Sequence, residues 1–302
     1  MNSNHRPRRS ALYVPGANAR ALEKARGLDA DVLLIDLEDS VAPDAKEAAR
    51  DLVIEALTAG GYGERELIVR INGLETAWST GDIAALALAG ADGILLPKVE
   101  NGDMVRSVVG RLHDAGAPET LSIWCMMETP GAMLNANGIA AASPRLAALV
   151  MGTTDLTKDL RARTTPDRLA MLPSLGLCLL AARAHGLAAL DGVHMDLSDD
   201  AGFAAVCNQG RDLGFDGKTL IHPKTLAAAN EIFAPQADEL EFARRLIQAH
   251  GEAEANGLGV VLLDGKLIEA LHVVEAKRLI ALAAAISERS ETPAELTGAV
   301  VD

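Results

Sequence analysis

Short apolar segments alternate with Ala-rich amphipathic segments over residues 10–233. Continuous apolar runs of this length are typical of parallel strands that are buried on both faces. The expected strands, all rich in Leu, Ile and Val, are residues 11–15, 32–37, 67–71, 93–97, 121–126, 146–152, 188–193 and 219–222.

The intervening segments carry apolar residues three and four positions apart, which predicts helices at 43–57, 82–88, 102–113 and 201–213. Eight strands in a strand–helix rhythm predict a (β/α)₈ TIM barrel. The same rhythm is compatible with a doubly wound sheet, which is the alternative fold. The segment 154–186 is longer than one crossover requires, so we expect it to hold a loop and two helices.

The pattern changes after Pro235. An amphipathic helix is expected at 238–256, then an apolar run at 260–263, an Asp264-Gly265 turn and a helix through 276–286. We therefore divide the chain into a barrel at 10–233 and a C-terminal helical extension at 234–302. The extension either caps its own barrel or reaches a neighbouring subunit, and its last dozen residues are expected to be frayed.

The charge and composition narrow the function classes. The 302 residues include 28 Lys and Arg against 42 Asp and Glu, a net charge of −14, with 3% aromatic residues. This disfavours nucleic acid as a partner, because its recognition needs cationic and stacking surfaces. Neither a membrane-spanning run nor a secretory signal is expected. Three widely separated cysteines suit a reducing compartment, so we expect a cytoplasmic protein.

Polar residues follow several of the expected strands. In a TIM barrel the active site lies at the C-terminal ends of the strands, where such residues are not explained by packing. The candidates in chain order are Asp36, Glu38, Asp39, Arg70, Asn72, Lys98, Glu128, Asp155, His194 and His222.

Glu128 and Asp155 follow consecutive strands. Two carboxylates so placed can share one Mg²⁺, with water and substrate oxygens completing its coordination. No His or Cys is clustered with them, which disfavours zinc. Alternatively, each carboxylate caps a helix or pairs with Arg or Lys. Pro130 after Thr129 indicates a helix start capped by Thr129, which would leave Glu128 free.

Arg70 lies inside an apolar strand and shares a strand face with Ile68 and Asn72. A charged residue in this position is rarely buried unless it is paired. If the face points into the barrel, Arg70 reaches toward Glu38 or a bound anion. The alternative is a structural ion pair with Asp36 or Glu38.

Arg20 and Lys24 are four residues apart, so they share one face of a helix. Together with Lys98 and Arg9 they are candidates for a cationic mouth that binds a phosphorylated ligand. Each residue taken alone is more often a solvated surface charge.

Six motifs resemble those of the citrate lyase β-subunit-like branch of the HpcH/HpaI aldolase superfamily, in family order and over residues 10–286. They are Leu12-Tyr13-Val14-Pro15-Gly16, Ile35-Asp36-Leu37-Glu38-Asp39-Ser40-Val41, Val69-Arg70-Ile71-Asn72-Gly73, Leu96-Pro97-Lys98-Val99-Glu100, Met127-Glu128-Thr129-Pro130-Gly131-Ala132, and Gly217-Lys218 with Ile221-His222-Pro223. One departure is His194, where an aromatic residue such as Tyr is expected.

The resemblance implies a (β/α)₈ fold, Mg²⁺ with Mn²⁺ as a substitute, and lyase or synthase chemistry on acyl thioesters. It implies that Glu128 and Asp155 are metal ligands and that Arg70 binds substrate. Asp264, in Leu263-Asp264-Gly265-Lys266, matches a C-terminal aspartate that such enzymes insert into a neighbour's site. This implies a homo-oligomer, for which we expect a trimer or hexamer.

The main functional hypothesis is a Mg²⁺-dependent lyase for a 3-hydroxy-acyl-CoA that carries a carboxylate on C3, of the malyl-, citramalyl- or citryl-CoA type. It would yield an acyl-CoA and a 2-oxoacid. Glu128 and Asp155 would hold the metal against the oxoacid, and Arg70 would face the developing oxyanion. Glu38 would orient Arg70 or move protons, and Asp264 would exchange a proton on the acyl carbon. Arg20, Lys24 and Lys98 would bind the CoA phosphates.

Three alternatives stay open. The chain could act as an aldolase on free hydroxy oxoacids, or as a synthase or thioesterase on malyl-CoA with the same site. It could also be the β subunit of a citrate lyase complex that acts on an acyl-carrier thioester.

Overall fold

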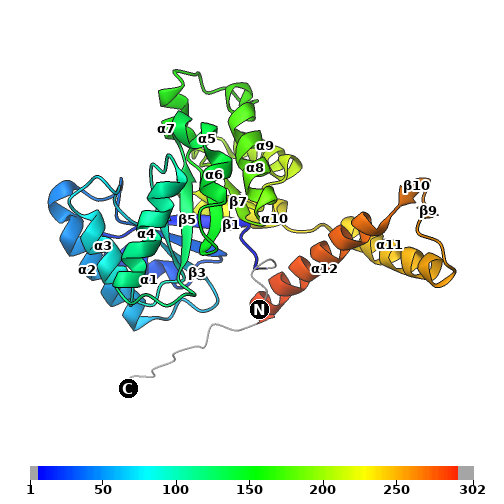
Figure 1. The fold of residues 1–302 in the computed structure, drawn as a ribbon, viewed down its shortest axis with the longest axis horizontal. Helices are drawn as coiled ribbons and strands as arrows, with labels where there is room; N and C mark the ends of the chain where they lie inside the picture. Colours follow the sequence, from blue (N-terminus) through cyan, green and yellow to red (C-terminus); the bar gives the residue numbers. More distant parts are fainter. Residues whose placement is uncertain (1–5, 292–302) are drawn as a thin grey trace. The chain divides into compact units, whose positions relative to one another are not determined.

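The computed structural model describes residues 6–291, which form two compact units, Arg8–Phe233 and a C-terminal unit that begins at Ala234. The first unit is a closed barrel of eight parallel strands in chain order (Figure 1). Its strands are β1 (Ser10–Pro15), β2 (Val32–Asp36), β3 (Glu66–Arg70), β4 (Gly93–Leu96), β5 (Ser122–Met127), β6 (Leu146–Met151), β7 (Ala188–Asp191) and β8 (Gly217–Leu220).

Pairing of β8 with β1, from Ser10 opposite Lys218 to Leu12 opposite Leu220, closes the sheet. This confirms the TIM barrel and excludes the doubly wound alternative, whose sheet is open. The helices are α1 (Ala19–Ala25), α2 (Lys46–Ala59), α3 (Ser79–Leu86), α4 (Gly102–Asp114), α5 (Pro130–Leu134), α6 (Ala136–Ala140), α7 (Thr153–Asp159), α8 (Leu172–Ala184), α9 (Asp200–Leu213) and α10 (Leu226–Ile232).

Several predicted bounds were displaced. The helix expected at 82–88 begins at Ser79, and the strand expected at 219–222 is Gly217–Leu220. The segment 154–186 contains α7, a short 3₁₀ turn at Leu169–Met171 and α8, with a loop between them. Two helices and a loop were expected there, so this prediction is confirmed.

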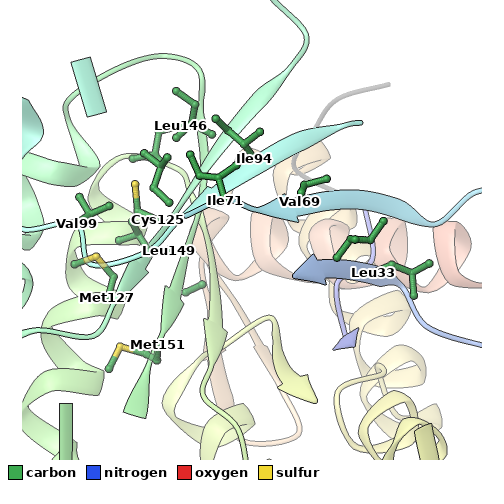
Figure 2. Close-up of a cluster of buried hydrophobic side chains, with 14 of the residues drawn as sticks. Leu33, Val69, Ile71, Ile94, Val99, Cys125, Met127, Leu146, Leu149 and Met151 are labelled. Carbon is green, nitrogen blue, oxygen red and sulfur yellow. The ribbon is translucent and has the colours of Figure 1, made fainter. Parts of the chain in front are cut away.

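Alternation along each strand separates two buried layers. Outward-facing side chains pack toward the helices, among them Leu33, Val69, Ile94, Cys125 and Leu149 (Figure 2). Inward-facing side chains fill the barrel and form a separate cluster. It consists of Ala11, Val32, Leu34, Ile68, Leu95, Trp124, Met126, Ala148, Val150 and Leu190.

The N-terminal end of the barrel is closed by a buried charge pair. Arg8 donates two hydrogen bonds to Glu66, at 2.7 and 2.8 Å, and its guanidinium lies 5.2 Å from the Trp124 ring centre. Glu66, Ile68 and Arg70 are the alternate residues of β3, so they share its inward face. The strand therefore begins with a carboxylate at the closed end and finishes with Arg70 at the opposite end.

The C-terminal unit consists of α11 (Ala237–Ala255), a hairpin of β9 (Val261–Leu263) and β10 (Lys266–Ile268), and α12 (Ala270–Glu291). The hairpin was not predicted, because three-residue strands are too short to show periodicity. Asp264 and Gly265 both have positive φ, 49° and 75°, which is the conformation that a two-residue hairpin turn requires. The expected fraying of the last dozen residues lies outside the described residues.

Within residues 6–291, no helix is both long enough and apolar enough to cross a membrane.

Candidate active site

Arg70, at the end of β3, is held between two carboxylates. Its Nε and Nη2 donate to Asp36 Oδ1 and Oδ2 at 2.7 and 2.8 Å, and its Nη1 lies 2.9 Å from Glu38 Oε2. The Tyr13 ring centre is 4.9 Å from the guanidinium carbon. Arg70 thus points into the barrel and forms the ion pairs with both Asp36 and Glu38 that the sequence suggested. Arg70 is fixed in direction before any ligand arrives.

The pair is buried, with Arg70 8% and Asp36 2% exposed. Burial alone would raise the pKa of Asp36, but the hydrogen bonds and charge of Arg70 hold that pKa below its usual value. Asp36 also accepts hydrogen bonds from the backbone N–H groups of Glu38 and Ser40, at 2.8 and 3.0 Å. Its carboxylate therefore shapes the start of the β2–α2 loop as well as the orientation of Arg70.

Glu128, directly after β5, is a buried carboxylate that caps no helix. Thr129 Oγ1 accepts the Ala132 N–H at 3.0 Å and Pro130 occupies the first position of α5, which confirms the predicted cap. Glu128 is 3% exposed, and its Oε1 accepts the Lys98 backbone N–H at 2.7 Å. Burial, above all, raises the pKa of Glu128 to about 7, and the charges of Glu38 and Asp155 add to that effect.

Glu128 lies against the backbone of the next strand. Met127 pairs with Met151, so Glu128 is level with Gly152, and a Cβ at Gly152 would lie 2.6 Å from Glu128 Oε2. Glycine at 152 is therefore a spatial requirement. Three residues further on, the half-buried Asp155 lies in the first turn of α7, near enough to affect the pKa of Glu128.

This arrangement fits a divalent cation. The charge of Asp155 adds to the cost of ionising Glu128, and a cation bound beside both carboxylates would remove that cost. Within residues 6–291, no three His, Cys, Asp or Glu side chains gather as a metal site. A metal bound here would therefore take Glu128 and Asp155 from the protein and oxygens of water or substrate for the rest, as Mg²⁺ commonly does.

Lys98 follows β4 and Pro97, and it lies between Glu128 and Glu38. Its backbone donates to Glu128, while its Nζ lies 2.7 Å from Glu38 Oε1. Asp36, Arg70, Glu38 and Lys98 thus form a chain of alternating charge across the ends of β2, β3 and β4. Beside it lies a hollow of about 290 Å³, whose lining includes Glu38, Lys46, Asn72, Trp78 and Lys98.

The other predicted cations are differently placed. Arg20 and Lys24 are exposed on α1, and neither has an ion-pair partner within the described part of the chain. Arg9 was wrongly grouped with them. It precedes β1, is buried, and forms a two-point ion pair with Asp31 at 2.9 Å, so it belongs to the closed end of the barrel.

Asp264 lies in the C-terminal unit, at the turn between β9 and β10. Both of its carboxylate oxygens accept from Arg245 Nη2, at 2.7 and 2.6 Å, and its side chain is about half exposed. The prediction that Asp264 is a turn residue is therefore confirmed. An exposed carboxylate at a hairpin tip is also able to reach a second molecule.

Two site residues were missed as such from the sequence, whereas the expected ion pair between Arg70 and Asp36 is present. Tyr13 shares the inward face of β1 with Ala11, and its alternation alone could have suggested a contact with Arg70. Gly152 gave no signal, because the sequence does not reveal how closely Glu128 approaches it.

Buried carboxylates beside a fixed arginine at the mouth of a (β/α)₈ barrel define a metal-assisted enzyme site for an anionic substrate. The family model described as HpcH/HpaI aldolase/citrate lyase matches residues 9–223. The chain belongs to this family, as its motifs indicated.

Relatives cover almost the whole chain. A (3S)-malyl-CoA thioesterase of Cereibacter sphaeroides is 52% identical over 281 residues, covering 93% of this chain and 96% of the relative. A citrate lyase subunit beta of Leuconostoc mesenteroides subsp. cremoris is 38% identical over 286 residues, covering 93% and 95%. The crystal structure of CitE from Mycobacterium tuberculosis in complex with magnesium, acetoacetate and coenzyme A is similar with a TM-score of 0.74. It is 29% identical and covers 91% of this chain and 97% of that one.

Gly152→Ala should displace the Glu128 carboxylate, because the added methyl group would occupy its place. We expect Mn²⁺ binding, followed by electron paramagnetic resonance, to weaken by on the order of tenfold or more. The free energy of unfolding should also fall, by about 1–3 kcal/mol. Gly110→Ala in α4, where an added Cβ meets nothing within 4 Å, is the control. It should leave Mn²⁺ affinity intact and raise the free energy of unfolding by up to about 1 kcal/mol, because Ala favours the helix over Gly. Unchanged Mn²⁺ affinity in Gly152→Ala would contradict this description of the site.

Proposed function

We propose that the protein is a Mg²⁺-dependent carbon–carbon lyase for a 3-hydroxy-acyl-CoA with a carboxylate on C3, of the malyl-, citramalyl- or citryl-CoA type. The observation that carries the proposal is that a pair of carboxylates and a fixed arginine lie at the same mouth of the barrel. Glu128 lies near enough to Asp155 for its pKa to be affected, a carboxylate pair that suits a divalent cation, and Arg70 supplies a fixed positive charge. The CitE complex with magnesium, acetoacetate and coenzyme A supports this combination of ligands.

The reaction breaks the bond between C2 and C3 of the acyl chain. The C3 hydroxyl loses its proton and becomes the keto group of a 2-oxoacid, while C2 keeps the bonding electrons as the enolate of an acyl-CoA and is then protonated. Mg²⁺ held by Glu128 and Asp155 would supply Lewis-acid polarisation of the substrate's oxygens. Stabilisation of the oxyanion, removal of the hydroxyl proton and binding of the CoA phosphates are left to side chains of the protein.

Arg70 presents its charge where oxyanion charge develops, and it needs no rearrangement because Asp36 and Tyr13 already hold it. Glu38 lies between Arg70 and Lys98, and burial raises its pKa against the lowering effect of these two cations. A carboxylate with a raised pKa is suited to accept the hydroxyl proton. Arg20 and Lys24, exposed on α1, are available for the CoA phosphates, and Lys98 borders the same mouth.

The C-terminal unit completes this proposal. We infer that residues 234–302 reach a neighbouring barrel in a homo-oligomer, a trimer or hexamer, and that Asp264 there exchanges the proton on the acyl carbon. The exposed hairpin turn that carries Asp264 supports such a reach. Three buried free cysteines, Cys125, Cys178 and Cys207, support a reducing, cytoplasmic location.

Thioester hydrolysis is the second candidate, and the 52% identical malyl-CoA thioesterase favours it. The two reactions leave different products. Cleavage of malyl-CoA yields glyoxylate and acetyl-CoA, whereas hydrolysis yields malate and free CoA thiol. The citrate lyase subunit role predicts instead that the isolated protein is inactive on every CoA thioester and acts only with partner subunits.

The purified protein with Mg²⁺ should therefore be assayed with malyl-, citramalyl-, citryl- and hydroxymethylglutaryl-CoA. Released oxoacid, acyl-CoA and thiol should be measured separately. We expect oxoacid and acyl-CoA in equal amounts, and loss of activity when a chelator removes the metal. Glu128→Gln should lose metal binding and turnover while the protein remains folded, because the amide cannot replace the ionised ligand. Full activity in excess chelator would overturn the metal assignment, and thiol release without oxoacid would establish the thioesterase.

Arg70→Lys should lower kcat by on the order of 10²–10³, the usual cost of one oxyanion donor. Lysine keeps a charge beside Asp36 but cannot form the planar fork that also reaches Glu38. Arg50→Lys is the matched control, since Arg50 on α2 also forms an ion pair with a buried carboxylate, that of Asp82. The control should keep kcat even if its melting temperature falls. A purely structural role for Arg70 predicts instead that both variants lose stability and both keep their turnover.

The Asp264 proposal is tested by mixing subunits. Asp264→Asn, which tolerates the positive φ of this turn, and Glu128→Gln should each be nearly inactive. After the two are unfolded and refolded together in equal amounts, about a quarter of the sites should combine an intact barrel with an intact donor tail. Activity should recover to that extent. If Asp264 serves its own barrel, every site keeps one lesion and the mixture stays inactive despite demonstrated subunit exchange.

A further inference from the structure

Lys98 has an unusual backbone conformation for its residue type. Its φ is 51°, in the left-handed region, where glycine is the default residue and Asn or Asp are the common exceptions. Lysine has no short polar group that could stabilise this conformation locally. Residues held in such a conformation persist only when the surroundings fix them, and they concentrate at functional sites. The question is what a lysine supplies here that glycine would not.

The two ends of Lys98 are bound to two different carboxylates. Its backbone N–H donates to Glu128 Oε1 at 2.7 Å, and its Nζ donates to Glu38 Oε1 at 2.7 Å. Glycine would supply the first contact but not the second. Glu38 in turn contacts Arg70 Nη1 at 2.9 Å. Through these two hydrogen bonds, Lys98 connects the carboxylate proposed to hold the metal with the charge chain that holds Arg70.

We propose that Lys98 is a positioning residue that fixes the metal side of the site relative to the arginine side. Its side chain, anchored on Glu38, holds the left-handed turn, and the turn aims the N–H at Glu128. This inference rests on the proposed function for its substrate, but its geometry is independent of which thioester is cleaved. It also gives Lys98 a different role from Arg20 and Lys24. Those two residues have no ion-pair partner in the described structure, whereas Lys98 already has one.

Two substitutions separate the contributions of the turn and the tether. Lys98→Gly removes the tether but adopts the left-handed conformation freely, so the N–H should stay on Glu128. Lys98→Ala removes the tether and keeps the conformational cost of a Cβ, so the turn should relax and withdraw the N–H. The first readout is Mn²⁺ affinity by electron paramagnetic resonance, which needs no substrate. We expect Lys98→Gly to match the unaltered protein and Lys98→Ala to bind Mn²⁺ on the order of tenfold more weakly.

The second readout is turnover with malyl-CoA and with the malyl thioester of pantetheine, which lacks the CoA phosphates. In Lys98→Gly, kcat should fall on the order of 10- to 100-fold on both thioesters, with KM nearly unchanged, because Glu38 and Arg70 lose their link to the metal side. Arg20→Ala and Lys24→Ala are the contrasting variants. If these two bind phosphate, each should raise KM on malyl-CoA and leave the pantetheine thioester unaffected.

Equal Mn²⁺ affinity in Lys98→Ala and Lys98→Gly would overturn the proposal, since the side chain would then not hold the turn. A loss in Lys98→Gly confined to KM on malyl-CoA would also overturn it and would make Lys98 a phosphate ligand. If the unaltered protein cleaves neither thioester, the proposed function fails, whereas the Mn²⁺ comparison still decides the role of Lys98.

Discussion

The structure of the barrel mouth depends on charge neutralisation among buried side chains. Asp36, Arg70 and Glu38 are each less than a tenth exposed, and each has an oppositely charged neighbour within 2.9 Å. Removing an ion from water costs several kcal/mol unless such a partner compensates for it. The alternation of sign along β2, β3 and β4 therefore favours the ionised forms of Asp36 and Arg70 and fixes their directions, whereas burial still raises the pKa of Glu38. Glu128 lacks such a partner within residues 6–291, where the hydrogen bond to its carboxylate comes from the neutral N–H of Lys98, and its pKa rises to about 7.

The position of Glu128 follows from the barrel register and suits the metal site that we propose, which has fewer than three protein ligands. The barrel register sets Glu128 level with Gly152, whose missing side chain leaves room for the carboxylate, and α7 then brings Asp155 near. There the charge of Asp155 adds to the cost of ionising Glu128. A divalent cation would remove that cost, so stability and metal affinity are linked through the same pair.

The sequence was sufficient for the architecture and for the list of polar residues at the strand ends, since both follow from local pattern. It was insufficient where position depends on distant parts of the chain. The β9–β10 hairpin is too short for periodicity, although Asp264-Gly265 is a strong turn pair. Arg9 and Lys98 are both cations near strand ends, yet one seals the closed end with Asp31 and the other borders the mouth. Only strand direction and register separate them. The two possible ion-pair partners of Arg70 also could not be ranked from sequence, because one guanidinium contacts both Asp36 and Glu38.

The distribution of cations suggests how an acidic protein can receive a polyanionic thioester. A net charge of −14 repels such a ligand at long range, so attraction must come from local, uncompensated positive charge. Arg70 and Lys98 cannot supply it, because Asp36 and Glu38 already neutralise them. Their charge becomes effective only at short range, against an oxyanion inside the mouth, where the dielectric is low. Arg20 and Lys24 on α1 carry exposed charge without an ion-pair partner in the described structure, so they can act during the approach. Under the proposed function, the cations that capture a ligand are thus separate from those that stabilise charge developing within it. This separation is why a substitution in the first group should change KM and one in the second should change kcat.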